Sequence, residues 1–150
     1  MSVASRVQSR KFESASQEAI VALVVSASVV LQRMNDLLRR YGLTHDQYNV
    51  LRILRGAQPD GHPRGEIGKR MMSRAPDVTR LLDRLERQGL VARGWAPENR
   101  RLSIARITPA GLELLAAADP EVLALQVEMT RGLALEELRA LTRACDHIAG

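Results

Sequence analysis

Cysteine and aromatic residues are both scarce in this 150-residue chain. Cys145 is the single cysteine, which excludes an intrachain disulfide. With no secretory leader in evidence, we expect a reducing, cytoplasmic compartment. Aromatic residues make up only 3% of the sequence, so the core must consist of aliphatic side chains. Its three histidines are scattered rather than set at metal-ligand spacing, and we expect neither a metal site nor another cofactor.

Long apolar runs and enzyme motifs are missing as well. The most apolar stretch, Ala19–Leu31, is 13 residues long and contains two serines, short of the roughly 18–20 residues that a membrane span requires. We expect it to be a helix buried on several sides, and no membrane association. No glycine-rich phosphate loop, nucleophile elbow or helix with paired histidines is present, so nothing in the sequence favours an enzyme.

Positive charge is concentrated in one segment. The chain carries a net charge of +5, and residues 64–106 hold eleven basic against five acidic side chains. The remaining 107 residues hold eleven basic and twelve acidic side chains and are close to neutral. A confined basic patch is typical of a nucleic-acid-binding surface, although a solvated basic face has the same composition.

Apolar periodicity and cap residues predict a mainly α-helical protein with one β-hairpin. Gly42 is expected to end the first long helix, and Thr44 with Gln47 forms a capping box for the next. Pro120 should kink or split the helix that contains it. The expected helices are 13–40, one from 44, 65–72, 76–88, one from 108 and 135–149, and the expected strands are 90–95 and 102–107. A helix pair followed directly by a hairpin predicts a winged helix-turn-helix with a two-stranded wing.

The helix predicted at 76–88 has two chemically different faces. At 100° per residue, Val78, Leu81, Leu82 and Leu85 share one face, whereas the opposite face is rich in arginine. An apolar stripe docks such a helix on its neighbours, and exposed guanidinium groups bind guanine edges or phosphates in the major groove. The candidate DNA-binding residues of this helix are Arg74, Pro76, Asp77, Thr79, Arg80, Arg84 and Arg87. An ordinary amphipathic surface helix remains an alternative.

Within this set, position along the helix separates two roles. Side chains near the N-terminus of such a helix reach deepest, which favours Arg74, Thr79 and Arg80 as base contacts and leaves Arg84 and Arg87 to phosphates. Asp77 would either accept from a cytosine or cap the helix, and we favour the cap. Arg100 and Arg101 lie at the hairpin turn, so a basic wing accompanies the basic helix.

These motifs resemble those of the MarR family of multiple-antibiotic-resistance regulators. Residues 78–91, VTRLLDRLERQGLV, are similar to the family's recognition helix, and residues 93–115 to its wing and following helix. LTHDQYNVLRIL, residues 43–54, resembles the family's second helix. The resemblance extends over about Ser14 to Ile148, nearly the whole chain.

The resemblance implies a homodimeric transcriptional regulator, typically a repressor, that binds a pseudo-palindromic operator. It divides a single unit, residues 1–150, into dimerisation helices (1–42 and 109–150) and a winged helix-turn-helix (43–108). It also implies release from DNA by a small aromatic or anionic effector bound between these parts. Tyr48 and Arg52, at i and i+4, are candidates for such an effector, or else an ordinary core tyrosine and surface arginine.

Two positions depart from the family pattern. Asn99 stands where the family has an acidic residue before the paired arginines, and Glu98 is a possible substitute partner. The last helix lacks a good N-cap, since Ala134 occupies that position. Cys145 lies on the apolar stripe of that helix, where packing is a more ordinary role than redox sensing. The alternative function is an interaction or architectural protein with the same fold and no sequence-specific operator.

Overall fold

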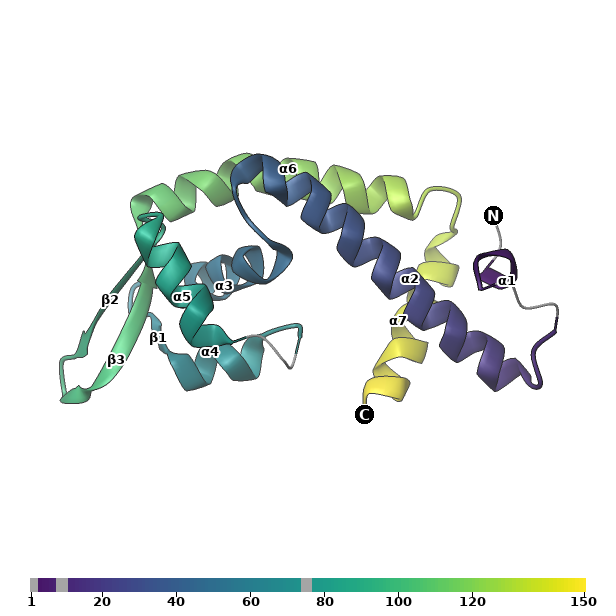
Figure 1. Cartoon of the computed structure of the whole chain (residues 1–150), viewed down its shortest axis with the longest axis horizontal. Coiled ribbons are helices and arrows are strands. Elements are labelled where there is room, and N and C mark those ends of the chain that lie inside the picture. The colour runs from purple at the N-terminus through teal and green to yellow at the C-terminus, as the bar shows by residue number, and fades with distance from the viewer. Residues whose placement is uncertain (1–2, 8–10, 74–76) are drawn as a thin grey trace.

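Two long helices, α2 (Ala15–Leu38) and α6 (Pro109–Met129), form an arch that carries the other elements beneath it (Figure 1). A computed structural model of the chain describes residues 3–7, 11–73 and 77–150. The winged part lies under one end of the arch, and α1 lies at the other end. The remaining elements are α1 (Val3–Arg6), η1 (Arg39–Tyr41), α3 (His45–Gly56), β1 (His62–Pro63), α4 (Arg64–Arg70), α5 (Val78–Arg87), β2 (Val91–Ala96), β3 (Asn99–Ile107) and α7 (Leu135–Ala149).

The Thr44–Gln47 capping box and the helix end at Gly42 are present as predicted, whereas α2 starts at Ala15, two residues after its predicted start. Thr44 Oγ1 accepts from the Gln47 backbone N–H at 3.2 Å, and Gln47 Oε1 accepts from the Thr44 N–H at 2.9 Å, which completes the capping box. Gly42 adopts the left-handed φ of 69° that ends the α2–η1 segment. The last helix begins at Leu135 without a side-chain cap at Ala134, whose N–H instead donates to Glu137 Oε2.

The sheet contains one strand more than expected. β2 and β3 form the predicted antiparallel hairpin, and β1 pairs with β3 through His62 opposite Ala105. Gly61 permits this pairing, because it has a φ of +75° and a Cβ there would lie 2.3 Å from the Ala105 carbonyl oxygen. A two-residue strand has no periodicity, so sequence patterning did not detect it.

The core lies where α6 covers the winged part. Leu51 and Leu54 of α3, Leu85 of α5 and Leu115 of α6 are fully buried there, together with Ile67 of α4. Leucine and valine dominate this core, as the small aromatic content requires. Burial of one such side chain contributes about 1.5–3 kcal/mol relative to exposure, so this cluster fixes how α3, α5 and α6 pack.

Pro120 does not split its helix. α6 is continuous from Pro109 to Met129, contrary to one of the outcomes that the sequence predicts. Ala118 and Val122 on either side of Pro120 are buried in the core, whereas Pro120 itself is exposed. Packing on both sides therefore outweighs the loss of one backbone hydrogen bond.

The end of the arch away from the wing is apolar and uncovered. Val24 of α2 is 63% exposed and Leu141 of α7 is 52% exposed, and α7 buries none of its residues. The expectation that Ala19–Leu31 is buried on several sides is therefore wrong for a single chain. By length and composition, Ala15–Tyr41 would suffice to cross a membrane, a property that the core helix of a soluble protein shares.

Candidate nucleic-acid interface and adjoining cavity

The arginine-rich helix α5 starts at an acidic cap. Asp77 is the N-cap, and its Oδ1 accepts from the Arg80 backbone N–H at 3.2 Å, which confirms the favoured capping role. The helix begins at Val78, two residues after the predicted start at Pro76. Arg74 and Pro76, both candidate DNA contacts, lie outside the described residues.

Opposite faces of α5 behave as the helical periodicity predicts. Leu82 and Leu85 are buried in the core, and Val78 and Leu81 are half-buried. The Arg80 side chain is 80% exposed and lies 3.3 Å from Asp77 Oδ2. Arg84 and Arg87 are also exposed and form no ion pair within the described part of the chain. The outer face thus presents three guanidinium groups to an anion.

Thr79 is less accessible than its predicted role suggests. Its side chain is half-buried, and its Oγ1 accepts a hydrogen bond of 3.0 Å from Arg64 Nη1 at the start of α4. The hydroxyl proton is not used in this bond and remains a donor. Arg64 is exposed beside α5, a basic residue near this surface that sequence reasoning did not single out.

The wing tip is ordered by an amide rather than by an ion pair. Asn99 Oδ1 accepts from the backbone N–H of Arg101 at 3.0 Å across the turn. Glu98 forms no ion pair with any residue that the structure describes, so it does not replace the missing acid. Arg100 and Arg101 are both exposed at the tip.

Arg93 joins the wing to α5 instead of facing outward. Its Nη2 lies 2.6 Å from Asp83 Oδ1, and its Nε donates to Glu86 Oε2, both on α5. The hydrogen bond to Glu86 raises the pKa of Arg93 against the opposing effect of burial, and the bond to Asp83 adds to the rise. Arg106 donates to the Pro59 carbonyl oxygen at 3.3 Å. The exposed basic tip of the wing therefore consists of Arg100 and Arg101, without these two arginines.

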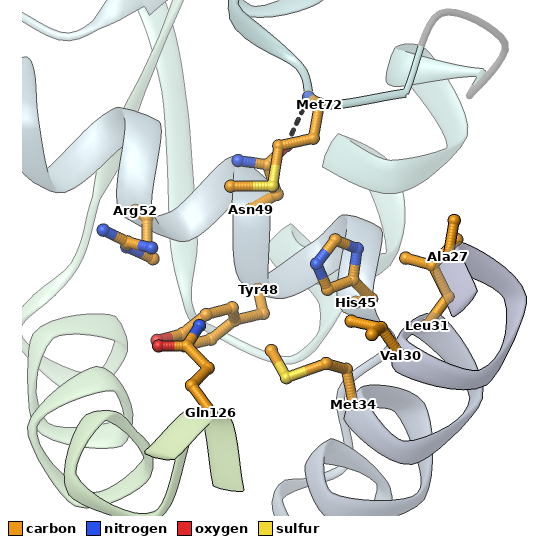
Figure 2. A pocket seen from close by; sticks show the side chains of 10 residues that line it. All are labelled: Ala27, Val30, Leu31, Met34, His45, Tyr48, Asn49, Arg52, Met72 and Gln126. Carbon is orange, nitrogen blue, oxygen red and sulfur yellow. Dashed lines mark hydrogen bonds between the residues drawn. The ribbon is translucent and has the colours of Figure 1, made fainter. Parts of the chain in front are cut away.

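A cavity of about 330 Å³ lies between α2, α3 and α6 and is also lined by Met72 (Figure 2). This volume is within the range of small-molecule sites. Both effector candidates line it, with Arg52 Cζ 5.9 Å from the centre of the Tyr48 ring. The lining residues are Ala27, Val30, Leu31, Met34, His45, Tyr48, Asn49, Arg52, Met72 and Gln126.

The carboxylate of Asp119, on α6, hydrogen-bonds to the cavity-lining residue Tyr48. Asp119 accepts 2.6 Å from the Tyr48 hydroxyl and 2.5 Å from Arg55 Nη1, so it joins α3 to α6. Burial opposes ionisation of Asp119, but these two hydrogen bonds and the nearby arginines outweigh it and lower its pKa. Burial, followed by donation to Asp119, raises the pKa of Tyr48 to about 12. Tyr48 is therefore both a core residue and part of the cavity wall, two roles that the sequence alone left as alternatives.

Within the described residues, no group of three or more His, Cys, Asp or Glu is arranged to hold a metal ion. His45 faces the cavity, and burial lowers its pKa, so its imidazole is neutral at physiological pH. Cys145 is a half-buried free thiol on α7.

Comparison with known proteins identifies the family. The model of the MarR family matches residues 43–103, from just before α3 into β3. The transcriptional regulator MhqR of Bacillus subtilis is 32% identical over 111 residues, which cover 73% of this chain and 74% of MhqR. The chain belongs to the MarR family. It is thus a winged-helix transcriptional regulator, as its motifs indicated.

Solved structures agree with this MarR-family assignment. A MarR transcription factor from Planctomyces limnophilus superposes with a TM-score of 0.70 at 36% identity, covering 91% of this chain and 98% of that one. The regulator Sco3205 from Streptomyces coelicolor, solved in complex with DNA, superposes with a TM-score of 0.80 at 22% identity, covering 93% and 89% of the two chains. The second similarity establishes the fold alone.

Proposed function

We propose that this MarR-family chain acts as a homodimeric repressor, with α5 in the major groove of a pseudo-palindromic operator and the wing on the adjacent minor groove. Arg80 reads base edges near the N-terminus of α5, and Arg84 and Arg87 bind phosphates. Arg74, Pro76 and Thr79 contribute DNA contacts at that end, whereas Asp77 caps the helix. Arg100 and Arg101 bind the minor groove or its phosphates.

One observation carries the proposal: among the described residues, the exposed arginines of α5 and of the wing tip form no protein ion pairs, apart from the cap contact of Arg80. Arg93 of β2 binds Asp83 and Glu86 of α5. These contacts fix the position of the wing relative to the basic face of α5. Such guanidinium groups are available to phosphates and guanines without first breaking internal contacts. Sco3205, which shares this fold, was solved in complex with DNA.

The uncovered apolar end supports the division into two functional regions. We infer that residues 1–42 and 109–150 pair with the same residues of a second copy, and that 43–108 form the DNA-binding region. Val24 of α2 and Leu141 of α7 are more than half exposed in the single chain, as an isologous interface requires. In this proposal a second copy of the chain, rather than a bilayer, covers α2. The proposed location of the dimer is therefore the cytoplasm.

The cavity is the proposed effector site. Its position between α2 and α6 of the dimerisation region and α3 of the DNA-binding region lets an occupant influence both. Tyr48 offers an aromatic face and Arg52 a positive charge at the same wall, which suits a small aromatic anion. No catalytic step is assigned to the chain, since its relatives are transcriptional regulators.

Operator binding by two variants tests the assignment of α5 and the wing. Arg80→Ala is expected to relax base preference at one position of each half-site, at a cost of about 1–3 kcal/mol for the preferred base. The double change of Arg100 and Arg101 to Ala should weaken all sequences evenly and lower the salt slope by about 1 for each phosphate that is no longer bound. Arg131→Ala, which removes a charge from the remote α6–α7 connection, is the matched control. If the first two variants bind like the control, α5 and the wing do not form the interface.

A further inference from the structure

Two side chains of α3 accept hydrogen bonds from Met72 and Ser73, in the turn that precedes α5. Asn49 Oδ1 accepts from the Met72 backbone N–H at 2.8 Å, and Asp46 Oδ1 accepts from the Ser73 hydroxyl at 2.9 Å. A backbone N–H only donates, so the Asn49 atom that it meets is the carbonyl oxygen. Both bonds join the N-terminal half of α3 to the segment just before α5.

Asn49 is unusual because it is a polar residue within the buried side of α3. It is 5% exposed, next to the fully buried Val50, and it forms part of the cavity wall. Figure 2 shows its hydrogen bond to Met72 at the edge of the cavity, with the Met72 side chain beside it. A buried amide at such a position requires a partner, and Met72 supplies it.

The anchoring of α5 differs between its two ends. Leu82, Leu85 and the contacts of Arg93 fix its middle and C-terminal part to the core and wing. Its N-terminal end is held by the half-buried Val78 and by Thr79, which accepts from Arg64 of α4, and it follows Ser73 of the turn by four residues. This is also the end from which a major-groove helix reaches the bases.

We propose that Asn49 positions the N-terminal end of α5 through Met72, and that this hydrogen bond is where occupancy of the cavity acts on DNA binding. An occupant that shifts the Met72 backbone, or that itself donates to Asn49 Oδ1, breaks the bond and loosens the turn before the end of α5 that reads bases. Met72 and His45 also line a second cavity of about 230 Å³ that reaches Asp46 and Ser73. The two bonds of the turn therefore lie at two neighbouring cavities that share Met72 and His45 in their linings. The inference rests on the proposed function, because it concerns how that function is regulated.

Substitution of Asn49 tests the positioning role. Asn49→Leu removes the acceptor at similar volume, and Gln58→Leu is the matched control, because it makes a similar change at an exposed amide outside the cavity lining. We expect the Met72 amide of Asn49→Leu to exchange with solvent at least tenfold faster, measured by hydrogen exchange on the intact dimer. We also expect operator binding to weaken about tenfold. Asn49→Asp keeps an acceptor beside Arg52. It should therefore restore much of the slow Met72 exchange and much of the operator affinity.

The coupling to the cavity is tested without knowledge of the natural effector. In a Cys145→Ala background, Ala27→Cys on the cavity wall is labelled with a benzyl methanethiosulfonate, and complete labelling is verified by mass. Filling the cavity in this way should speed Met72 exchange and weaken operator binding, and should add little in the Asn49→Leu protein. The same label at Gln32→Cys, on α2 but outside the cavity lining, is the control.

The outcomes separate the two proposals. If wild-type protein selects no operator, the proposed function fails, whatever the exchange data show. If wild-type protein binds an operator and Asn49→Leu binds it equally well, the positioning role is refuted. If the label at Ala27→Cys leaves both Met72 exchange and operator affinity as they are in the Gln32→Cys control, the coupling to the cavity is refuted.

Discussion

Asp119 connects α3 to α6, and its replacement by asparagine should destabilise the protein by a predictable amount. The carboxylate accepts from Tyr48 at 2.6 Å and from Arg55 at 2.5 Å. A hydrogen bond to a charged group contributes about 1.5–3 kcal/mol, and the partial exposure of this site reduces that figure. Asparagine keeps one acceptor oxygen, so we expect a net loss of about 1–2 kcal/mol, or about 3–6 °C in Tm.

The effect should depend on pH in a defined direction. The folded-state pKa of Asp119 is lowered, so its stabilisation is fully present above the unfolded-state value near 4. It is lost as the pH falls through the lower folded-state value. The difference between wild type and Asp119→Asn should therefore be constant from about pH 5 to pH 7 and shrink below about pH 4.

Urea and thermal unfolding at a fixed dimer concentration measure this difference. Glu113→Gln is the matched control, an exposed residue of the same helix with no ion pair within the described part of the chain. Equal stability of Asp119→Asn and the control at pH 7 would show that the two hydrogen bonds do not stabilise the fold. A difference that persists unchanged at pH 2 would show that the charge of Asp119 is not its cause.

Three further substitutions test other parts of the structure. Arg93→Met removes the contacts that hold the wing to α5, so it should weaken operator binding several-fold without changing the salt slope. Fluorescence anisotropy at several salt concentrations measures both, and a reduced slope would mean that Arg93 contacts phosphate. Gly111→Ala places a Cβ 2.5 Å from the Leu90 carbonyl oxygen and should destabilise the protein by about 1–3 kcal/mol in urea unfolding, whereas a stability unchanged from wild type would contradict this close contact. Leu141→Glu puts a charge on the apolar face of α7 and should shift sedimentation from dimer to monomer, and a dimer of undiminished affinity would remove α7 from the interface.

Features encoded in neighbouring residues could be predicted from the sequence. The Thr44–Gln47 capping box, the left-handed Gly42 and the cap at Asp77 each depend on residues within one helical turn. The buried stripe of α5, with Leu82 and Leu85, follows from helical periodicity alone. These local signals were sufficient to place the helix-turn-helix and its hairpin.

Features that join distant parts of the chain could not be predicted in this way. Tyr48 and Asp119 are 71 residues apart in sequence, and Asn49 and Met72 are 23 apart. No residue type or spacing marks either pair. Arg93 illustrates the same limit, because an arginine on a strand is equally suited to DNA and to acids of a neighbouring helix.

Selection from a random duplex DNA library is the decisive test of sequence-specific binding by a dimer. Purified protein is incubated with the library at physiological salt, and the bound fraction is sequenced. We predict an enriched motif with two-fold symmetry and half-sites about 10 base pairs apart, or a multiple of that spacing. Salt-sensitive binding with no enriched motif would contradict this prediction, and would indicate an architectural or interaction role for the same basic surface.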